Sequence, residues 1–105
     1  MITINITFIG QQIQQIEISG HANFDKLGKD IVCAGVSTIV YGSINAIDQL
    51  AKNQIHFQMK EGYTKIKVYQ NSKDLQNLLK MMVIQFQTLE DSYGQFIKIN
   101  QLMEV

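Results

Sequence analysis

The chain has 105 residues, 46 % hydrophobic and 17 % charged, so we treat residues 1–105 as a single domain that packs a core. Nine Lys balance nine Asp and Glu, and Arg is absent, so the drive to bind phosphates is weak and no direct nucleic-acid binding is expected. The one cysteine, Cys33, excludes an intramolecular disulfide and an all-cysteine metal site, and favours a reducing, cytoplasmic setting.

Residues 1–19 alternate between apolar and polar side chains, which predicts two strands, 1–9 and 13–19. Ile2, Ile4, Ile6 and Phe8 share one face of the first strand. A short turn at 10–12 makes an antiparallel hairpin of the two. The first residues have no basic segment and no cleavage site, so they do not resemble a signal peptide.

Residues 20–30 have no clean period and carry two Gly and four charges, which predicts a loop long enough to be functional. From Ile31 to Lys52 the apolar residues follow a helical stripe, with Asp30 as the expected N-cap. No apolar stretch in the chain approaches the about 20 residues of a membrane helix, so no membrane segment is expected.

The second half repeats this order, with strands at 55–60 and 64–69, a strongly amphipathic helix at 72–93 that stops at Gly94, and a strand at 96–102. In the first of these strands, Ile55, Phe57 and Met59 are predicted to face inward. The order ββαββαβ predicts an α+β fold, with a mixed or antiparallel sheet and two helices packed on one face. Met81 and Ile84 lie off the main helical stripe, and they mark either a dimer interface or a deeper core.

Cys33 and His21 are the residues with chemistry to explain, because they flank the predicted loop. With Asp30 as N-cap, the thiol lies in the first helical turn, where the helix dipole contributes about 0.3–1 kcal/mol and lowers the pKa by less than one unit. A strongly reactive thiol therefore needs a partner such as the His21 imidazole. The alternatives are a Cys33 that is a small core residue and a His21 that hydrogen-bonds within the loop.

Four neighbours have supporting roles to test, and each also has a structural explanation. Gly20 lets the backbone come close beside His21; Gly35 and Ser37 flank the thiol, where backbone N–H groups at a helix start can bind an oxyanion. Asp30 is an N-cap or orients His21, a role for which Asp25 is the weaker alternative. The other histidine, His56, belongs to a polar strand face, and no zinc-ligand spacing is present, so neither a metal nor another cofactor is expected.

These residues carry a resemblance to a known family. Gly20-His21-Ala22, the eleven residues between His21 and Cys33, and Asp-Ile-Val-Cys-Ala-Gly-Val-Ser at 30–37 resemble the bacterial ribosomal-processing cysteine protease Prp family. The opening Met-Ile-Thr-Ile-Asn-Ile and the segment 42–47 are similar as well, and the element order agrees with the family fold.

The resemblance implies a cysteine endopeptidase that removes a short, hydrophobic N-terminal extension from large-subunit ribosomal protein number twenty-seven. It implies Cys33 as nucleophile, His21 as general base, a homodimer, and a mobile loop over the substrate. In this chain that loop is 22–30, where Gly28 supplies flexibility and Phe24 and Leu27 are candidates to contact an apolar peptide. The competing hypotheses are a non-catalytic ribosome-associated protein-binding module and a cysteine hydrolase that acts on a small molecule.

Overall fold

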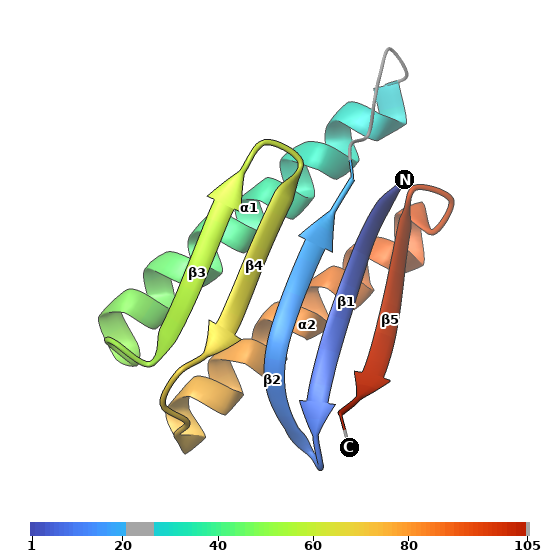
Figure 1. The fold of residues 1–105 in the computed structure, drawn as a ribbon. Helices are drawn as coiled ribbons and strands as arrows, with labels where there is room; N and C mark the ends of the chain where they lie inside the picture. Colours follow the sequence, from blue (N-terminus) through green and yellow to red (C-terminus); the bar gives the residue numbers. More distant parts are fainter. Residues whose placement is uncertain (21–26, 105) are drawn as a thin grey trace.

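The computed structural model describes residues 1–20 and 27–104, and for 27–30 the backbone alone. Seven elements follow the predicted order ββαββαβ (Figure 1). They are β1 (Ile2–Ile9), β2 (Gln12–Ser19), α1 (Leu27–Leu50), β3 (Ile55–Lys60), β4 (Tyr63–Val68), α2 (Lys73–Tyr93) and β5 (Ile97–Met103).

The five strands form one mixed sheet in the order β3-β4-β2-β1-β5. All neighbouring strands are antiparallel except β1 and β5, which are parallel because α2 carries the chain across the sheet between β4 and β5. Both helices cover the same face of this sheet, as predicted, and the opposite face is open (Figure 1). The mixed α+β fold expected from the sequence is therefore confirmed.

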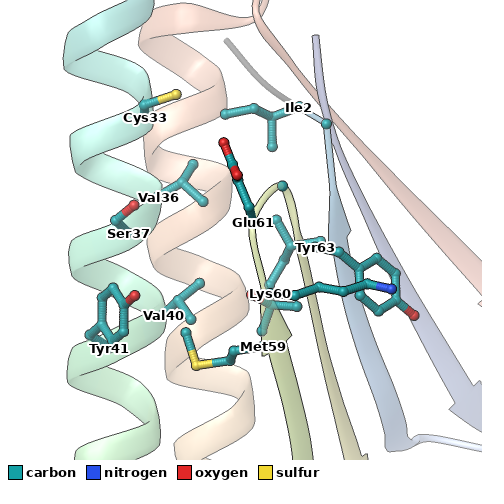
Figure 2. A pocket seen from close by; sticks show the side chains of 14 residues that line it. Ile2, Cys33, Val36, Ser37, Val40, Tyr41, Met59, Lys60, Glu61 and Tyr63 are labelled. Carbon is teal, nitrogen blue, oxygen red and sulfur yellow. The ribbon is translucent and has the colours of Figure 1, made fainter. Parts of the chain in front are cut away.

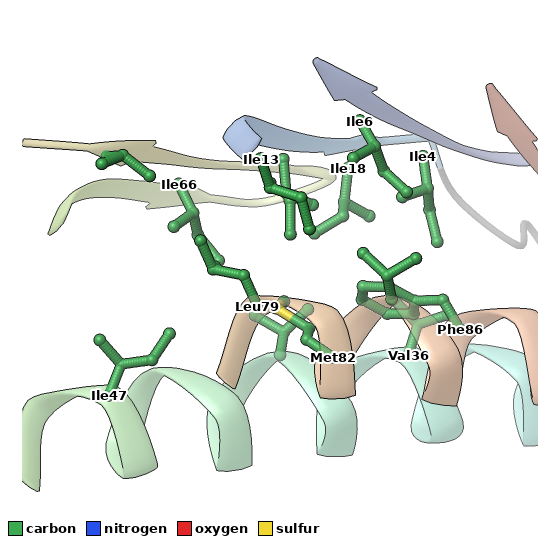
Figure 3. Close-up of a cluster of buried hydrophobic side chains, with 14 of the residues drawn as sticks. Ile4, Ile6, Ile13, Ile18, Val36, Ile47, Ile66, Leu79, Met82 and Phe86 are labelled. Atoms are coloured by element: carbon green, nitrogen blue, oxygen red, sulfur yellow. The ribbon is translucent and has the colours of Figure 1, made fainter. Parts of the chain in front are cut away.

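The core lies between the sheet and the two helices (Figure 3). Ile2, Ile4 and Ile6 of β1 are buried on the inner face, as their alternation predicts. Ile13 joins this face although its number is odd, because a β-bulge between Thr7 and Phe8 shifts the register of β2. The buried residues of α2 are Leu75, Gln76, Leu79, Met82, Val83 and Phe86. Gln76 and Val83 lie outside the predicted stripe, and the stripe residues Leu78, Leu89 and Tyr93 are only partly buried.

The two ends of α2 also follow the sequence prediction. Ser72 is the N-cap, and its hydroxyl accepts a hydrogen bond from the backbone N–H of Leu75 at 3.1 Å. Asp74 lies in the first turn, where its charge opposes the helix dipole favourably. Gly94 is the C-cap.

The start of α1 differs from the prediction. The helix begins at Leu27, so Asp30 is its fourth residue and not the N-cap, and the helix ends at Leu50 instead of Lys52. Gly28 was expected to give flexibility to the loop 22–30, but one glycine costs only about 1 kcal/mol in a helix and does not stop a long one. Leu27 and Gly28 therefore belong to the first turn of α1 and not to a flexible loop.

The apolar length of α1 was also underestimated. The 20 residues Ile31–Leu50 are long and apolar enough to cross a membrane by length and composition alone. Val32, Val36, Val40 and Ile47 from this stretch are buried in the core, as in the core helix of a two-layer fold. The length argument against a membrane segment is thus wrong.

The side chains of β3 have the predicted direction, but one of the inward-facing residues is not buried. Phe57 pairs with the buried Ile66 and so lies on the inner face, yet 54 % of its surface is exposed. The reason is the place of β3 at the edge of the sheet, which the linear pattern does not reveal.

Candidate functional site

Cys33 is the seventh residue of α1 and is half-buried, with its side chain directed toward the end of the sheet near Ile2 (Figure 2). It packs against the core, which agrees in part with the interpretation of Cys33 as a small core residue. A helix leaves only its first four N–H groups without internal partners, and those belong to residues 27–30. The expectation that Cys33 lies in the first turn, with free N–H groups at 33–35 for an oxyanion, is therefore wrong.

The thiol does, however, line a cavity of about 450 Å³ between α1 and the β3–β4 hairpin (Figure 2). One wall is a single face of α1, on which residues recur at helical spacing. The opposite wall is the hairpin, and the end is closed by β1 and β2. The lining residues are Ile2, Ile18, Gly20, Cys33, Val36, Ser37, Val40, Tyr41 and 59–64.

Gly20 lies at the rim of this cavity, directly after β2. Its φ is +104°, and a Cβ here would collide with the backbone carbonyl oxygen of Met1. Its N–H donates to the carbonyl of Gly62 in the hairpin at 3.1 Å. The close approach predicted for Gly20 is thus present, and it joins the end of β2 both to β1 and to the hairpin.

Ser37 and Gly35, the two other predicted neighbours of the thiol, have separate places. Ser37 lies one turn after Cys33, is exposed and lines the same cavity. Gly35 turns away from the cavity, because a Cβ on it would stand 3.1 Å from a side-chain carbon of Leu89 in α2. Gly35 therefore permits close packing of the two helices and does not contribute to the site.

The remaining predicted site residues lie outside what the structure describes. These are His21, Phe24 and Asp25, together with the side chains of Leu27 and Asp30. Among the described residues, no group of three His, Cys, Asp or Glu side chains is placed to hold a metal ion.

The hairpin wall was missed by the sequence interpretation, which treated Glu61 only as part of a turn. In Figure 2 the Glu61 carboxylate points into the cavity toward Cys33, and Met59 and Tyr41 face each other farther along. Tyr63 anchors the hairpin to β2, because its hydroxyl donates to the Glu17 carboxylate at 2.5 Å, which raises the pKa of the tyrosine. Only the pairing of β4 with β2 brings this wall to the cysteine, and that pairing has no local signal.

Comparison with known proteins decides the class. The family model described as cysteine protease Prp matches residues 1–98. The chain belongs to this family. It is therefore a cysteine protease, which confirms the resemblance and favours the enzyme over the non-catalytic binding module.

Prp relatives cover nearly the whole chain. The ribosomal processing cysteine protease Prp of Staphylococcus aureus is 35 % identical over 104 residues, covering 95 % of this chain and 98 % of that protein. The Bacillus subtilis protein of the same name is 31 % identical over 94 residues, covering 83 % and 84 %.

A solved Prp structure confirms the fold. The crystal structure of the essential ribosomal processing protease Prp from S. aureus, in complex with a covalently linked product peptide, matches with a TM-score of 0.87 and 32 % identity. The match covers 96 % of this chain and 99 % of that one.

Proposed function

We propose that this Prp-family protease is cytoplasmic and removes the N-terminal extension of large-subunit ribosomal protein number twenty-seven, with Cys33 as nucleophile and His21 as general base. The observation that carries the proposal is that Cys33 and Gly20 line one cavity. Cys33 is the only thiol of the chain, and a cysteine protease needs one beside an accessible surface. The S. aureus relative, whose structure holds a covalently linked product peptide, supports a peptide substrate.

His21 is the proposed base because of its place in the sequence. It follows directly after Gly20, which lies on the rim of the cavity. His56, the other histidine, lies on β3 with its ring against Tyr69, at a centroid distance of 4.4 Å, and it is not among the cavity residues. The sequence position of His21 and the location of His56 outside the cavity lining together support His21 as the base.

The proposed chemistry is acyl transfer. His21 takes the Cys33 proton, the thiolate attacks the scissile carbonyl, and the imidazolium then protonates the leaving amine. Water, activated by His21, hydrolyses the thioester and releases the new C-terminus. Ser37, one turn along α1 in the same cavity, is placed to donate a hydrogen bond to the bound peptide.

The test is incubation with the extended ribosomal protein, followed by mass measurement of both products. Wild-type protein is expected to release the extension at one site, and Cys33→Ala and Cys33→Ser none. Circular dichroism must show that the variants are folded, which is expected because the side chain is only half-buried. Full cleavage by pure Cys33→Ala protein refutes the nucleophile.

The two histidines form a matched pair of variants. His21→Ala is expected to lose at least about 100-fold in kcat/KM, the usual contribution of a general base, whereas His56→Ala retains the wild-type value. Alkylation of Cys33 at neutral pH should slow in His21→Ala and remain unchanged in His56→Ala. Equal alkylation and cleavage rates in both variants assign the base to another residue.

We also propose a homodimer, built on α2. Met81 and Ile84 are 53 % and 59 % exposed, so they belong to the surface and not to a deeper core. Exposed apolar side chains on one helix face of a small protein are typical of an interface. Wild-type protein is expected to sediment as a dimer at tens of micromolar and Ile84→Glu as a monomer, with Gln49→Glu at an exposed position of α1 as the control; a monomeric wild type contradicts the proposal.

A further inference from the structure

The face of the sheet opposite the helices carries an uneven distribution of charge. Strand alternation and register direct four lysines onto it, and they are Lys60 of β3, Lys65 and Lys67 of β4, and Lys98 of β5. Seven lysines and seven acidic residues have described side chains; of the acids, Glu17 lies on this face, and Glu104, directly after β5, follows the same alternation as Lys98. Among the described side chains, the open face therefore carries more lysines than acidic residues.

The acids on the open face offset part of this charge. Glu17 pairs in register with Lys65, and its carboxylate also accepts a hydrogen bond from the hydroxyl of Tyr63. Lys67 lies between Gln15 and His56 in the register, so neither residue directly opposite it is acidic. Lys60 extends over the ring of Tyr63, with its ammonium group 5.4 Å from the ring centre, and away from the Cys33 cavity (Figure 2).

Aromatic rings lie among these lysines. Tyr69 follows the alternation of β4, is 65 % exposed, and stacks at a tilt of 55° on His56 of β3. Exposed rings on a flat sheet form a platform on which unpaired bases stack, and every base has a face that fits. The surface also presents amide groups, such as the Asn5–Asn100 pair, that can hydrogen-bond 2′-hydroxyls and base edges.

We propose that the open face of the sheet, from His56 and Tyr69 across Lys65 and Lys67, binds single-stranded RNA. Ammonium groups contact phosphates, and the rings stack with bases. A duplex suits this surface less well, because a flat sheet enters neither groove and stacked bases offer no face to the rings. This site is on the opposite side of the sheet from the Cys33 cavity, so it does not depend on the proposed cleavage reaction.

Salt dependence gives a quantitative expectation. Four lysine–phosphate contacts on a single strand correspond to a slope near −2.8 in log K against log salt, so affinity falls about 50-fold between 50 and 200 mM salt. Lys65→Gln combined with Lys67→Gln removes two contacts, and the fall shrinks to about 7-fold. The matched control is Lys73→Gln with Lys80→Gln on α2, which makes the same charge change and is expected to keep the wild-type slope.

The experiment is fluorescence anisotropy of a labelled single-stranded RNA of mixed sequence against the full chain. Tyr69→Ala should weaken binding about fivefold or more and Tyr69→Phe should not, since stacking needs the ring and not the hydroxyl. Equal binding by the two lysine double variants, or equal affinity for polyglutamate or anionic vesicles, overturns the proposal. Cleavage of the peptide substrate is expected to be unchanged in the Lys65/Lys67 variant, which separates this test from that of the protease.

Discussion

Replacing Gly20 with alanine tests how the cavity is assembled. The φ of +104° lies in the left-handed region, where an L-residue costs about 1–2 kcal/mol. The new Cβ would also collide with the carbonyl oxygen of Met1. This oxygen belongs to the backbone next to β1, so it cannot rotate away as a side chain can. The chain must therefore shift at the point where it leaves β2 for His21.

The expected consequence is a loss of activity larger than the loss of stability. A displacement of roughly 1 Å in a catalytic group costs about 100-fold in rate, and the residue next to Gly20 is the proposed base. Gly10→Ala is the control, because Gly10 has a similar left-handed φ of +59° but no atom within 4 Å of its Cβ position. That variant carries the conformational cost without the collision, and its kcat/KM should equal that of wild type.

The measurement combines urea unfolding with kcat/KM for peptide cleavage on the same preparations. Both variants should lower the free energy of unfolding by at least about 1 kcal/mol, with Gly20→Ala lower than Gly10→Ala. Under conditions in which both are folded, only Gly20→Ala should lose about 100-fold in kcat/KM. If Gly20→Ala cleaves within twofold of Gly10→Ala, then the close approach at Gly20 does not position the base, and the reasoning is refuted.

Two further predictions concern stability. Gln76 is 4 % exposed, and its side-chain amide hydrogen-bonds both the N–H and the C=O of Ile13 at 2.8 Å. Gln76→Leu leaves these two buried backbone groups unpaired and should lower the free energy of unfolding in urea by about 2 kcal/mol or more. Gln85→Leu, on the exposed side of α2, is the control and should lower it little. The Tyr63–Glu17 bond raises the tyrosine pKa above its ordinary value near 10, so its contribution to stability is present below pH 10 and is lost as the pH rises through the higher folded-state pKa. In Glu17→Gln, phenolate absorbance should appear at lower pH than in wild type, and an unchanged titration contradicts this assignment.

The elements themselves could be predicted because each has a local signal. The stripe of α2 and its Ser72 cap are within one segment, and so is the alternation of β1. The α1 boundary had no such signal. Asp30 is a residue type that favours the N-cap, and Gly28 is one that disfavours a helix interior. Each of these preferences is near 1 kcal/mol, and a long apolar helix outweighs them. The predicted position of Cys33 relative to the helix N-terminus depended on the first helical residue. An error of about one turn in that residue therefore moved Cys33 out of the first turn.

The cavity could not be predicted because its walls are distant in the sequence. Cys33 and Glu61 line the same cavity because β4 pairs with β2, which brings Gly62 beside Gly20. Local periodicity does not indicate which strands pair when a helix separates them in the sequence. The sequence does place Gly20 and Cys33 on the two sides of one short segment, and both line the cavity.

The charge of the open face shows what composition conceals. A formal net charge of zero was taken as evidence against nucleic-acid binding, but a sum over the chain says nothing about two faces of a sheet. The information was present in the segment Tyr63-Thr-Lys65-Ile-Lys67-Val-Tyr69, where alternate residues are basic or aromatic and those between them are buried. Because successive strand residues point to opposite faces, the relevant charge is that of every second residue, and on this strand it is +2 with two rings. Electrostatic expectations for a sheet protein should therefore be drawn for each face separately, after the strands have been assigned.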